Sequence, residues 1–373
     1  MKKILLVSLS KNFGGIERLF HNLFVNNVKD YHLDIITFHA KCAYQEDFEN
    51  EGYNVYSLPP RSKMKFAFSK VVKQFLREHN DYDYIWVNTA STSMYEFQYW
   101  GKRLTNAKII THSHGTESEK NGNISDLINN ILAKLNYKKV IKNTDLFLAC
   151  SKKAGIALFG KKYQDKIIVL NNLIDVPKFA FNNSIRFDIR EKLNISDNKF
   201  VVSMIGRLSN QKNIPFAMEI IKEVAKSNDN VAFFVTGDGE LKSFAENFVK
   251  EHSLCDKVVF TGNVLNVQDY YSVSDILIMP SFFEGFPLTI VEAQSNGLQC
   301  VISDKITIET KLSDLVEFLP ITNGTKIWVD KINHILENSD LKDFDKRKSY
   351  NIIVAEKKFD IKDATSLLKE ILN

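Results

Sequence analysis

The sequence has few of the features that mark several classes of protein. Its 373 residues include only four cysteines, which are widely spaced and form no CxxC or Cys/His ligand pattern. This argues against a disulfide scaffold or a structural zinc site and favours a reducing compartment. No apolar run approaches the roughly 18 residues of a membrane span. The GxGxxG pattern of dinucleotide-binding enzymes is missing, which disfavours an oxidoreductase.

The remaining composition is that of a soluble globular protein, with 44% hydrophobic and 25% charged residues. At roughly 150 residues per domain, the length predicts two or three domains. The sequence opens with Met1-Lys2-Lys3 and four aliphatic residues, a run too short for a signal peptide, and it meets Lys11 without a cleavage site. We therefore expect a buried first strand and a cytoplasmic protein.

Charge is divided unevenly along the chain. Residues 1–180 hold 26 Lys and Arg against 17 Asp and Glu, a balance of +9, which leaves 23 against 28, or −5, for residues 181–373. The division fits a first half that meets an anionic ligand or surface, or it is simply a drift in composition. No DNA- or RNA-binding motif accompanies the charge, so no nucleic-acid partner is expected.

Short apolar runs alternate with helix-length segments, a rhythm typical of parallel sheets covered on both faces. The rhythm breaks over residues 171–196, a polar stretch with Pro177 that we interpret as a linker. We therefore predict an α/β protein of two doubly wound, Rossmann-like domains, 1–178 and 179–351, facing across a cleft. A last helix is expected over 352–373. The predicted strands are residues 3–8, 33–38, 54–58, 84–88, 108–112, 146–150 and 167–170, then 200–206, 231–236, 258–261, 276–280 and 300–303.

Ligands of such sheets bind beyond the carboxyl ends of the strands. The most informative stretch there runs from Met279 to Ala293, where Pro287 is placed to start a helix. The free N–H groups near Leu288 and Thr289 would then bind phosphate. Glu284 is suited to sugar hydroxyls and Glu292 to a ribose, and the alternative is a capped helix with incidental acids.

Basic and glycine-rich loops follow two other strands of the second half. Arg207 and Lys212 leave one strand end together, and a guanidinium with an ammonium suits a diphosphate. The next strand ends in a Gly237-Asp238-Gly239 turn, which permits close approach to a ligand. Two basic residues in a loop are also common on solvated surfaces, and a plain turn predicts the glycines equally well.

In the first half, two strand ends carry the candidate residues. Gly14 and Gly15 precede a helix whose opening N–H groups can meet an anion, although an ordinary strand-to-helix turn looks the same. His112 and His114 end another strand, where a histidine can orient an acceptor hydroxyl or stabilise charge at a reacting sugar carbon. Structural histidines, or a weak zinc site without a third ligand, are the alternatives.

Taken in order, these motifs resemble those of the family 4 retaining glycosyltransferases, which have the two-domain GT-B fold. The family's E-x7-E element corresponds to Glu284 and Glu292, and its GR-x4-K element to Gly206-Arg207 and Lys212. The segments 149–160 and 292–304 are most similar to the capsular and exopolysaccharide enzymes. Gln299 and Asn171 stand where the family commonly has proline, which leaves the shape of two loops uncertain.

The resemblance implies that the helix over 352–373 packs back on the first domain, and it implies roles for individual residues. Arg207 and Lys212 would hold the donor diphosphate, Glu284 the donor sugar and Glu292 the ribose, while His114 would sit beside the anomeric carbon. His114, Glu284, Arg207 and Lys212 are then the catalytic candidates. The donor side comprises Arg207, Lys212, Gly237, Asp238, Val264, Glu284, Gly285, Phe286, Leu288, Thr289 and Glu292, and the acceptor side Gly14, Gly15, His112 and His114.

The resemblance also implies an activity. A hexose or N-acetylhexosamine would pass from a UDP-sugar to a lipid-diphosphate-linked oligosaccharide in capsule or exopolysaccharide synthesis, with retention of anomeric configuration. No cofactor and no metal are expected: Asp81-Tyr82-Asp83 imitates a metal motif but precedes its strand. A sugar-nucleotide epimerase of similar architecture and a non-catalytic partner subunit are the alternatives.

A possible membrane contact lies at residues 61–79. Basic residues alternate there with Phe66, Phe68 and Phe75 in the pattern of a basic amphipathic helix. Such a helix either lies on an anionic membrane, which would place the protein on the inner face of the plasma membrane, or packs its aromatic face on the sheet. Secondary candidates are Lys138-Lys139, Lys152-Lys153 and Lys161-Lys162.

Overall fold

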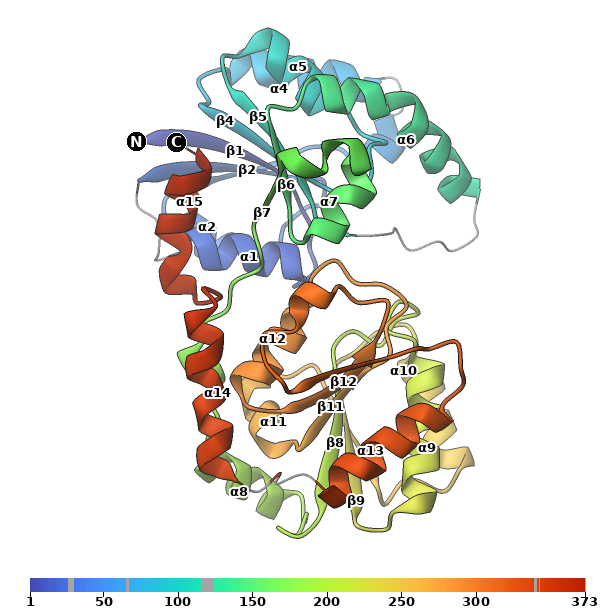
Figure 1. The fold of residues 1–373 in the computed structure, drawn as a ribbon. Coiled ribbons are helices and arrows are strands. Elements are labelled where there is room, and N and C mark those ends of the chain that lie inside the picture. The colour runs from blue at the N-terminus through green and yellow to red at the C-terminus, as the bar shows by residue number, and fades with distance from the viewer. Residues whose placement is uncertain (26–29, 65–66, 116–123, 339–340, 342, 373) are drawn as a thin grey trace. The chain divides into compact units, whose positions relative to one another are not determined.

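The computed structural model describes residues 1–25, 30–64, 67–115, 124–338, 341 and 343–372. The chain divides into two compact units. Unit 1 is Met1–Leu173 together with Ile361–Asn373, and unit 2 is Ile174–Asp360 (Figure 1). Among the described residues, no helix has both the length and the hydropathy needed to cross a membrane.

Unit 1 contains a parallel sheet of seven described strands in the order β3-β2-β1-β4-β5-β6-β7. The sheet is doubly wound, because the strand order reverses between β1 and β4. Its strands are β1 (Lys2–Leu9), β2 (Tyr31–Thr37), β3 (Asn54–Ser57), β4 (Tyr84–Thr89), β5 (Lys108–Ser113), β6 (Leu146–Ala149) and β7 (Ile167–Val169). Its helices are α1 (Gly15–Phe24), α2 (Gln45–Asn50), α3 (Arg61–Met64), α4 (Phe68–Glu78), α5 (Glu96–Leu104), α6 (Ile124–Lys142), α7 (Lys152–Phe159) and α15 (Ala364–Leu372), with 3-10 turns at Lys161–Lys166 and Ile361–Asp363.

Unit 2 repeats the design with six described strands in the order β10-β9-β8-β11-β12-β13, and its reversal lies between β8 and β11. Its strands are β8 (Phe200–Ile205), β9 (Val231–Thr236), β10 (Val258–Gly262), β11 (Ile276–Met279), β12 (Gln299–Ser303) and β13 (Val316–Leu319). Its helices are α8 (Asn183–Lys192), α9 (Ile214–Ser227), α10 (Lys242–Glu251), α11 (Val267–Val273), α12 (Leu288–Ser295), α13 (Lys326–Asn338) and α14 (Phe344–Glu356), with 3-10 turns at Pro177–Phe179 and Ile308–Thr310.

The predicted pair of doubly wound sheets is confirmed, and each predicted strand is present. The strand Val316–Leu319 was not predicted. The stretch 171–196 is not a simple linker, because it contains α8, whose polar sequence hides two buried arginines, Arg186 and Arg190. The units divide after Leu173, five residues before the predicted boundary.

The last helix was predicted as one piece over 352–373 that packs back on the first domain, but the structure has two helices there, of which α15 belongs to unit 1. The chain forms α14 in unit 2, turns at Lys358, which has a φ of +60°, and forms α15 in unit 1. Next to the turn, the N–H of Ile174 donates to the carbonyl of Phe359 at 3.0 Å, so the two segments that run between the units are joined there. Helix α15 buries Ala364, Leu368 and Leu372 in the same core as α1.

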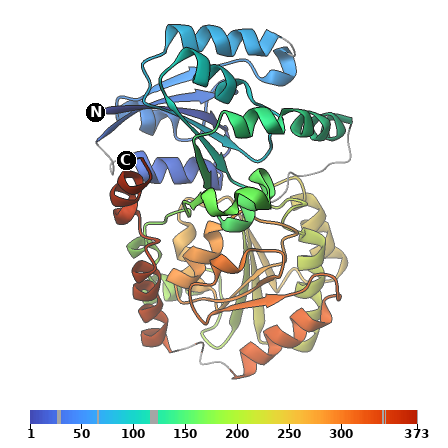
Figure 2. The same ribbon diagram turned by 45° about the horizontal axis from the view of Figure 1, so that its top comes forward.

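The predicted amphipathic helix over residues 61–79 does not offer an apolar face to a membrane. The structure has α3 and α4 there, while Lys65 and Phe66 lie outside the described residues. Phe68, Val72 and Leu76 are fully buried in the core between α4, α5 and the sheet of unit 1. Both views show α4 and α1 on opposite faces of that sheet (Figure 1, Figure 2). The aromatic face is therefore a core face.

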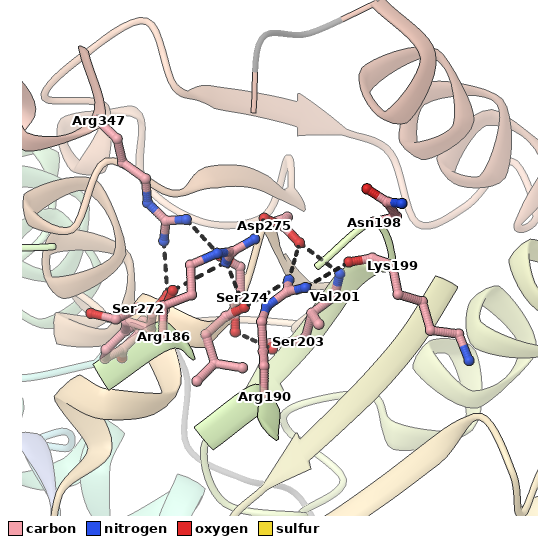
Figure 3. A network of polar contacts seen from close by, with 12 residues as sticks. Arg186, Arg190, Asn198, Lys199, Val201, Ser203, Ser272, Ser274, Asp275 and Arg347 are labelled. Carbon is pink, nitrogen blue, oxygen red and sulfur yellow. Dashed lines mark hydrogen bonds and ion pairs between the residues drawn. The ribbon is translucent and has the colours of Figure 1, made fainter. Parts of the chain in front are cut away.

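A buried ionic network ties the amino-end side of the unit 2 sheet together (Figure 3). The carboxylate of Asp275 lies 2.6 Å from Nη2 of Arg186 and 2.8 Å from Nη2 of Arg190, and all three side chains are buried. A third guanidinium, that of Arg347, donates to the carbonyl oxygens of Ser274 and Tyr271 at 2.8 Å. Burial, together with the neighbouring guanidiniums, lowers the pKa of Arg347 to about 9 although Asp275 opposes the shift.

The network also fixes strand register. The N–H of Val201 donates to a carboxylate oxygen of Asp275, and the N–H of Asp275 donates to the carbonyl of Val201, each at 2.8 Å. These bonds align β8 with β11. The guanidiniums of Arg186, Arg190 and Arg347 donate to carbonyl oxygens at the carboxyl end of α11, where the helix dipole is negative.

Replacing Asp275 with alanine should lower the free energy of unfolding by about 3 to 5 kcal/mol, because it leaves buried guanidiniums without their carboxylate. Urea titration followed by circular dichroism measures this. Asp229→Ala, which removes the exposed partner of Lys257, is the matched control and should leave the free energy of unfolding close to that of the wild type. Equal losses in the two variants would contradict the role given to the network.

Candidate functional site

The candidate donor residues gather at the reversal of the unit 2 sheet. Arg207 and Lys212 lie in the loop after β8, and residues 280–287 form the loop after β11, the neighbouring strand. The carboxyl ends of two strands at such a reversal diverge and leave a crevice for a ligand. The N–H of Phe282 donates to the carbonyl of Gln211 at 2.9 Å, so the two loops are bonded directly.

Close backbone contact sets the shape of the loop after β8. Gly237 adopts a φ of +130°, and a Cβ atom there would overlap the carbonyl oxygen of Gly206. A Cβ atom on Gly239 would overlap the carbonyl oxygen of Leu208 in the same way. The N–H of Leu208 donates to the carbonyl of Asp238 at 2.9 Å. The glycines therefore serve to pack one strand-end loop against the next.

Two of the proposed catalytic residues form an ion pair. Nζ of Lys212 lies 2.7 Å from Oε1 of Glu284, and both side chains are mostly buried. Gln211 donates from Nε2 to the carbonyl of Phe283 at 2.9 Å and to Oε2 of Glu284 at 3.3 Å. The pair neutralises the carboxylate at a place where a diphosphate is expected to bind, and an ammonium has two further N–H groups for phosphate oxygens.

Helix α12 presents the second acidic residue of the E-x7-E element. The helix begins after Pro287, whose side chain makes no capping hydrogen bond to the first N–H groups. Glu292 is buried in the second turn, where Tyr271 donates its hydroxyl to Oε2 at 2.6 Å. The hydroxyl holds the carboxylate in one orientation.

The other donor candidates differ in exposure. Phe286 is buried and stacks on Phe359 with ring centroids 5.6 Å apart, so its ring is held by packing within unit 2. Asp238 accepts from the N–H of Gly239 and from Lys242, and these donors lower its pKa. Arg207 is exposed, Leu288 is buried, and Gly237, Gly285, Thr289 and Val264 are half-buried, Val264 in the loop after β10.

In unit 1, the two candidate histidines form a layered pair at the end of β5. Their ring centroids lie 3.9 Å apart. His112 is 0% exposed, and its Nδ1 accepts from the indole N–H of Trp86 at 3.3 Å. His112 therefore packs against the ring of His114 and is held by Trp86, and its expected contact with an acceptor stays a prediction.

The hydrogen bonds of Asn88 assign the tautomer of His114. Nδ2 of Asn88 donates to the carbonyl of Val7 at 3.2 Å, so Oδ1 of the amide faces Nε2 of His114 at 2.8 Å. In this assignment His114 donates from Nε2 and keeps Nδ1 as the acceptor. Burial lowers the pKa of His114 to about 3 and also lowers that of His112, so both rings are neutral at physiological pH.

The glycine loop after β1 already holds an acid of its own. Helix α1 begins at Gly15, and the buried carboxylate of Glu17 folds back to accept the N–H of Ser10 at 2.8 Å. A Cβ atom on Gly14 would lie 2.7 Å from Oε2 of Glu17. The negative charge at this helix start works against a second anion, so the loop suits a neutral hydroxyl-rich ligand better than a phosphate.

Sequence reasoning missed four residues that position the candidates: Gln211, Tyr271, Trp86 and Asn88. Gln211 stands beside Lys212 within the GR-x4-K element, and Asn88 ends a predicted strand, so both carried a signal of position. Tyr271 and Trp86 had none, because neither lies in a recognised motif or at the end of a predicted strand.

Comparison with known proteins agrees with this geometry. A family profile described as Glycosyltransferase Family 4 matches residues 13–178, and one described as Glycosyl transferases group 1 matches residues 185–352. The chain belongs to the family 4 glycosyltransferases. The first profile covers most of unit 1 of this glycosyltransferase and the second most of unit 2.

Individual relatives support the assignment. The glycosyltransferase is 25% identical to EpsF of Bacillus subtilis, a protein named as a glycosyltransferase, over 89% of this chain and 87% of that one. It is 37% identical over 146 residues, 37% of each chain, to a protein of Escherichia coli named UDP-Gal:alpha-D-GlcNAc-diphosphoundecaprenol alpha-1,3-galactosyltransferase. Both relatives carry the name of a sugar transferase.

A solved structure confirms the fold. Anabaena HepE, crystallised with UDP and glucose, superimposes with a TM-score of 0.80 at 17% identity, covering 100% of this chain and 99% of that one. The glycosyltransferase therefore has the GT-B fold.

Gly237→Ala in this glycosyltransferase should lower the free energy of unfolding by about 2 to 4 kcal/mol, because the new methyl group meets backbone that cannot yield. Gly262→Ala is the matched control, since Gly262 also has a positive φ, +65°, but faces open space. Gly262→Ala should lower the free energy of unfolding by about 1 kcal/mol. Urea unfolding measures both, and equal losses would show that the packing of the two loops is unimportant.

The buried histidines predict a loss of stability in acid. The unfolded chain binds protons near the ordinary histidine pKa of 6.5, whereas folded His114 resists protonation down to about pH 3. The free energy of unfolding should therefore fall as pH drops from 6.5, by up to about 1.4 kcal/mol per pH unit for this group. His114→Gln, which retains a donor for Asn88, should flatten the decline, and an unchanged slope would contradict the interpretation.

Proposed function

We propose that this glycosyltransferase moves a hexose or N-acetylhexosamine from a UDP-sugar to a lipid-diphosphate-linked oligosaccharide, with retention of anomeric configuration and without a metal ion. The setting is capsule or exopolysaccharide synthesis at the inner face of the plasma membrane. The observation that carries the proposal is the Lys212–Glu284 pair at the sheet reversal, beside the start of α12.

The donor side is argued from charge. A diphosphate meets the exposed guanidinium of Arg207, the remaining N–H groups of Lys212 and the first backbone N–H groups of α12. Each donor becomes more favourable as negative charge grows on the departing UDP, and interactions that strengthen in the transition state accelerate the reaction. Glu284 and Glu292 accept hydroxyls of the sugar and the ribose.

The proposed reaction needs no protein nucleophile. The acceptor hydroxyl oxygen bonds to the anomeric carbon on the face from which UDP leaves, while the bond between that carbon and the β-phosphate oxygen breaks. The hydroxyl proton passes to a phosphate oxygen of the leaving UDP, so the products are the glycoside and UDP. His114, neutral and with Nδ1 free of the Asn88 bond, accepts a hydroxyl hydrogen bond of the bound sugar or acceptor.

The acceptor class is argued from the relatives. The E. coli relative carries both a UDP-sugar donor and a diphosphoundecaprenol acceptor in its name. In unit 1, the loop at Gly14 and Gly15 carries its own buried acid, Glu17, which fits hydroxyl recognition there. These observations support a lipid-linked glycan acceptor.

Calorimetry with UDP, GDP and ADP in the presence of EDTA tests the donor site. The wild type should bind UDP best, and Lys212→Ala should weaken binding about 10- to 100-fold, because it removes a charge-assisted bond and leaves Glu284 facing the phosphates. Lys331→Ala, which removes the surface partner of Glu317, is the matched control and should bind like the wild type.

Product analysis tests the chemistry. Incubation with UDP-sugars and an undecaprenyl-diphosphate-linked sugar should give a glycoside whose anomeric configuration, read by NMR, matches the donor. Inversion would overturn the retaining mechanism, and a requirement for added metal would overturn the metal-free one. Release of an epimerised sugar without a glycoside would favour an epimerase. Absence of nucleotide binding would favour a non-catalytic partner subunit.

A further inference from the structure

Helix α6 carries an unusual exposed apolar stripe. Leu127 and Leu135 are 62% and 68% exposed, and Ile128 and Ile131 are each 50% exposed. Residues 127, 131 and 135 are spaced four apart and so share one face of the helix, with Ile128 at its edge. Two leucines and two isoleucines gathered on one exposed face differ from the scattered apolar residues of an ordinary surface.

The second half of the same helix is firmly attached to unit 1. Nδ2 of Asn136 donates to the carbonyl of Ser93 at 2.9 Å, and the hydroxyl of Tyr137 donates to the carbonyl of Phe159 at 2.5 Å. Val140 is fully buried. The stripe therefore stands on a fixed support, and in both ribbon views the helix projects beyond the sheet of unit 1 (Figure 1, Figure 2).

Positive charge lies beside the carboxyl-terminal part of the stripe. Helix α6 contains four lysines, all after Ile131, and one acidic residue, Asp126, before Leu127. Three of the lysines are exposed and lie on the same side of the helix as the stripe: Lys134, Lys138 and Lys142. Lys134 follows Ile131 by three residues, Lys138 follows Leu135 by three, and Lys142 follows Lys138 by four. Exposed Lys161 and Lys162 follow Gly160, next to the carbonyl that Tyr137 binds.

We infer that α6 is the membrane-docking helix of this protein, lying on an anionic lipid bilayer with its four apolar side chains inserted among the acyl chains. The combination of apolar and basic side chains favours an anionic bilayer as the binding partner of α6. Leucine and isoleucine gain from insertion below the headgroups, while lysines beside them reach lipid phosphates, each contributing about a fivefold gain in binding.

Charge makes a second copy of this chain a poorer occupant. A symmetric contact through the stripe would enclose the ammonium groups of Lys134 and Lys138 in a protein interface, where they lose their hydration, whereas a bilayer surface supplies phosphates for them. The lysines also fit a helix that lies on the surface of the bilayer. The inference corrects the sequence-based placement of the membrane contact at residues 61–79, whose apolar face is buried.

The inference rests on the proposed function only in explaining why membrane docking would help the enzyme. A lipid-linked acceptor has its diphosphate at the membrane surface, so a protein held there by unit 1 meets its acceptor in two dimensions rather than three. The docking itself depends only on the residues of α6 and is measured without substrate.

Flotation of the full chain with vesicles tests the inference. The wild type should bind vesicles of equal parts phosphatidylglycerol and phosphatidylcholine at least about tenfold better than phosphatidylcholine alone. The variant Leu127→Ser/Ile131→Ser/Leu135→Ser and the variant Lys134→Glu/Lys138→Glu should each bind the anionic vesicles about tenfold more weakly. All five positions are exposed, so the variants should keep the wild-type melting temperature.

Lys63→Glu/Lys70→Glu is the matched charge control, because it makes the same charge change at exposed positions of α3 and α4. It should lower vesicle binding less than about twofold. The inference is overturned if the control falls as far as the α6 charge variant, if the serine variant binds like the wild type, or if the serine variant turns a dimer into a monomer. UDP calorimetry on the same samples separates the two proposals, since docking and donor binding lie in different units.

Discussion

The buried carboxylate of Asp275 is the constraint on which the donor unit depends. It receives two guanidiniums and the N–H of Val201, and so fixes β11 against β8 at the ends of the strands that face away from the candidate site. The opposite ends of these same two strands carry Arg207 with Lys212 and the loop with Glu284. A slip between the strands would separate the Lys212–Glu284 pair, so the geometry of the site is set by a network on the other side of the sheet.

Much of the fold and the main donor residues were predictable because their signals are local. Buried parallel strands are short apolar runs, and strand-end loops with Pro287 or paired glycines can be recognised from the sequence. The predictions that were wrong concern segments whose structure depends on residues far away in the sequence. Helix α8 has a polar sequence that resembles a linker, since its buried arginines are matched by a carboxylate 85 or more residues away. The break at Lys358 likewise follows from packing against Ile174.

The two basic helices of unit 1, α4 and α6, also show what cannot be predicted from the sequence pattern alone. Helix α4 has the sharper amphipathic pattern, yet its apolar face is core, whereas α6 has a weaker pattern and an exposed stripe. Periodicity tells which residues share a face but not what covers that face. The difference comes from tertiary structure: α4 packs flat on the sheet, while the attachments of α6 among the described residues lie in its middle and second half, at Ala133, Asn136, Tyr137 and Val140.

The placement of α15 has a consequence for the order in which the protein matures. Unit 1 takes its first 173 residues from the start of the chain and its last helix from the end, with all of unit 2 between them. During synthesis, the core around α1 therefore waits with an open apolar surface until Ala364, Leu368 and Leu372 leave the ribosome. Unit 2, continuous from Ile174 to Asp360, can close first, so the half that is translated first is the half that is completed last.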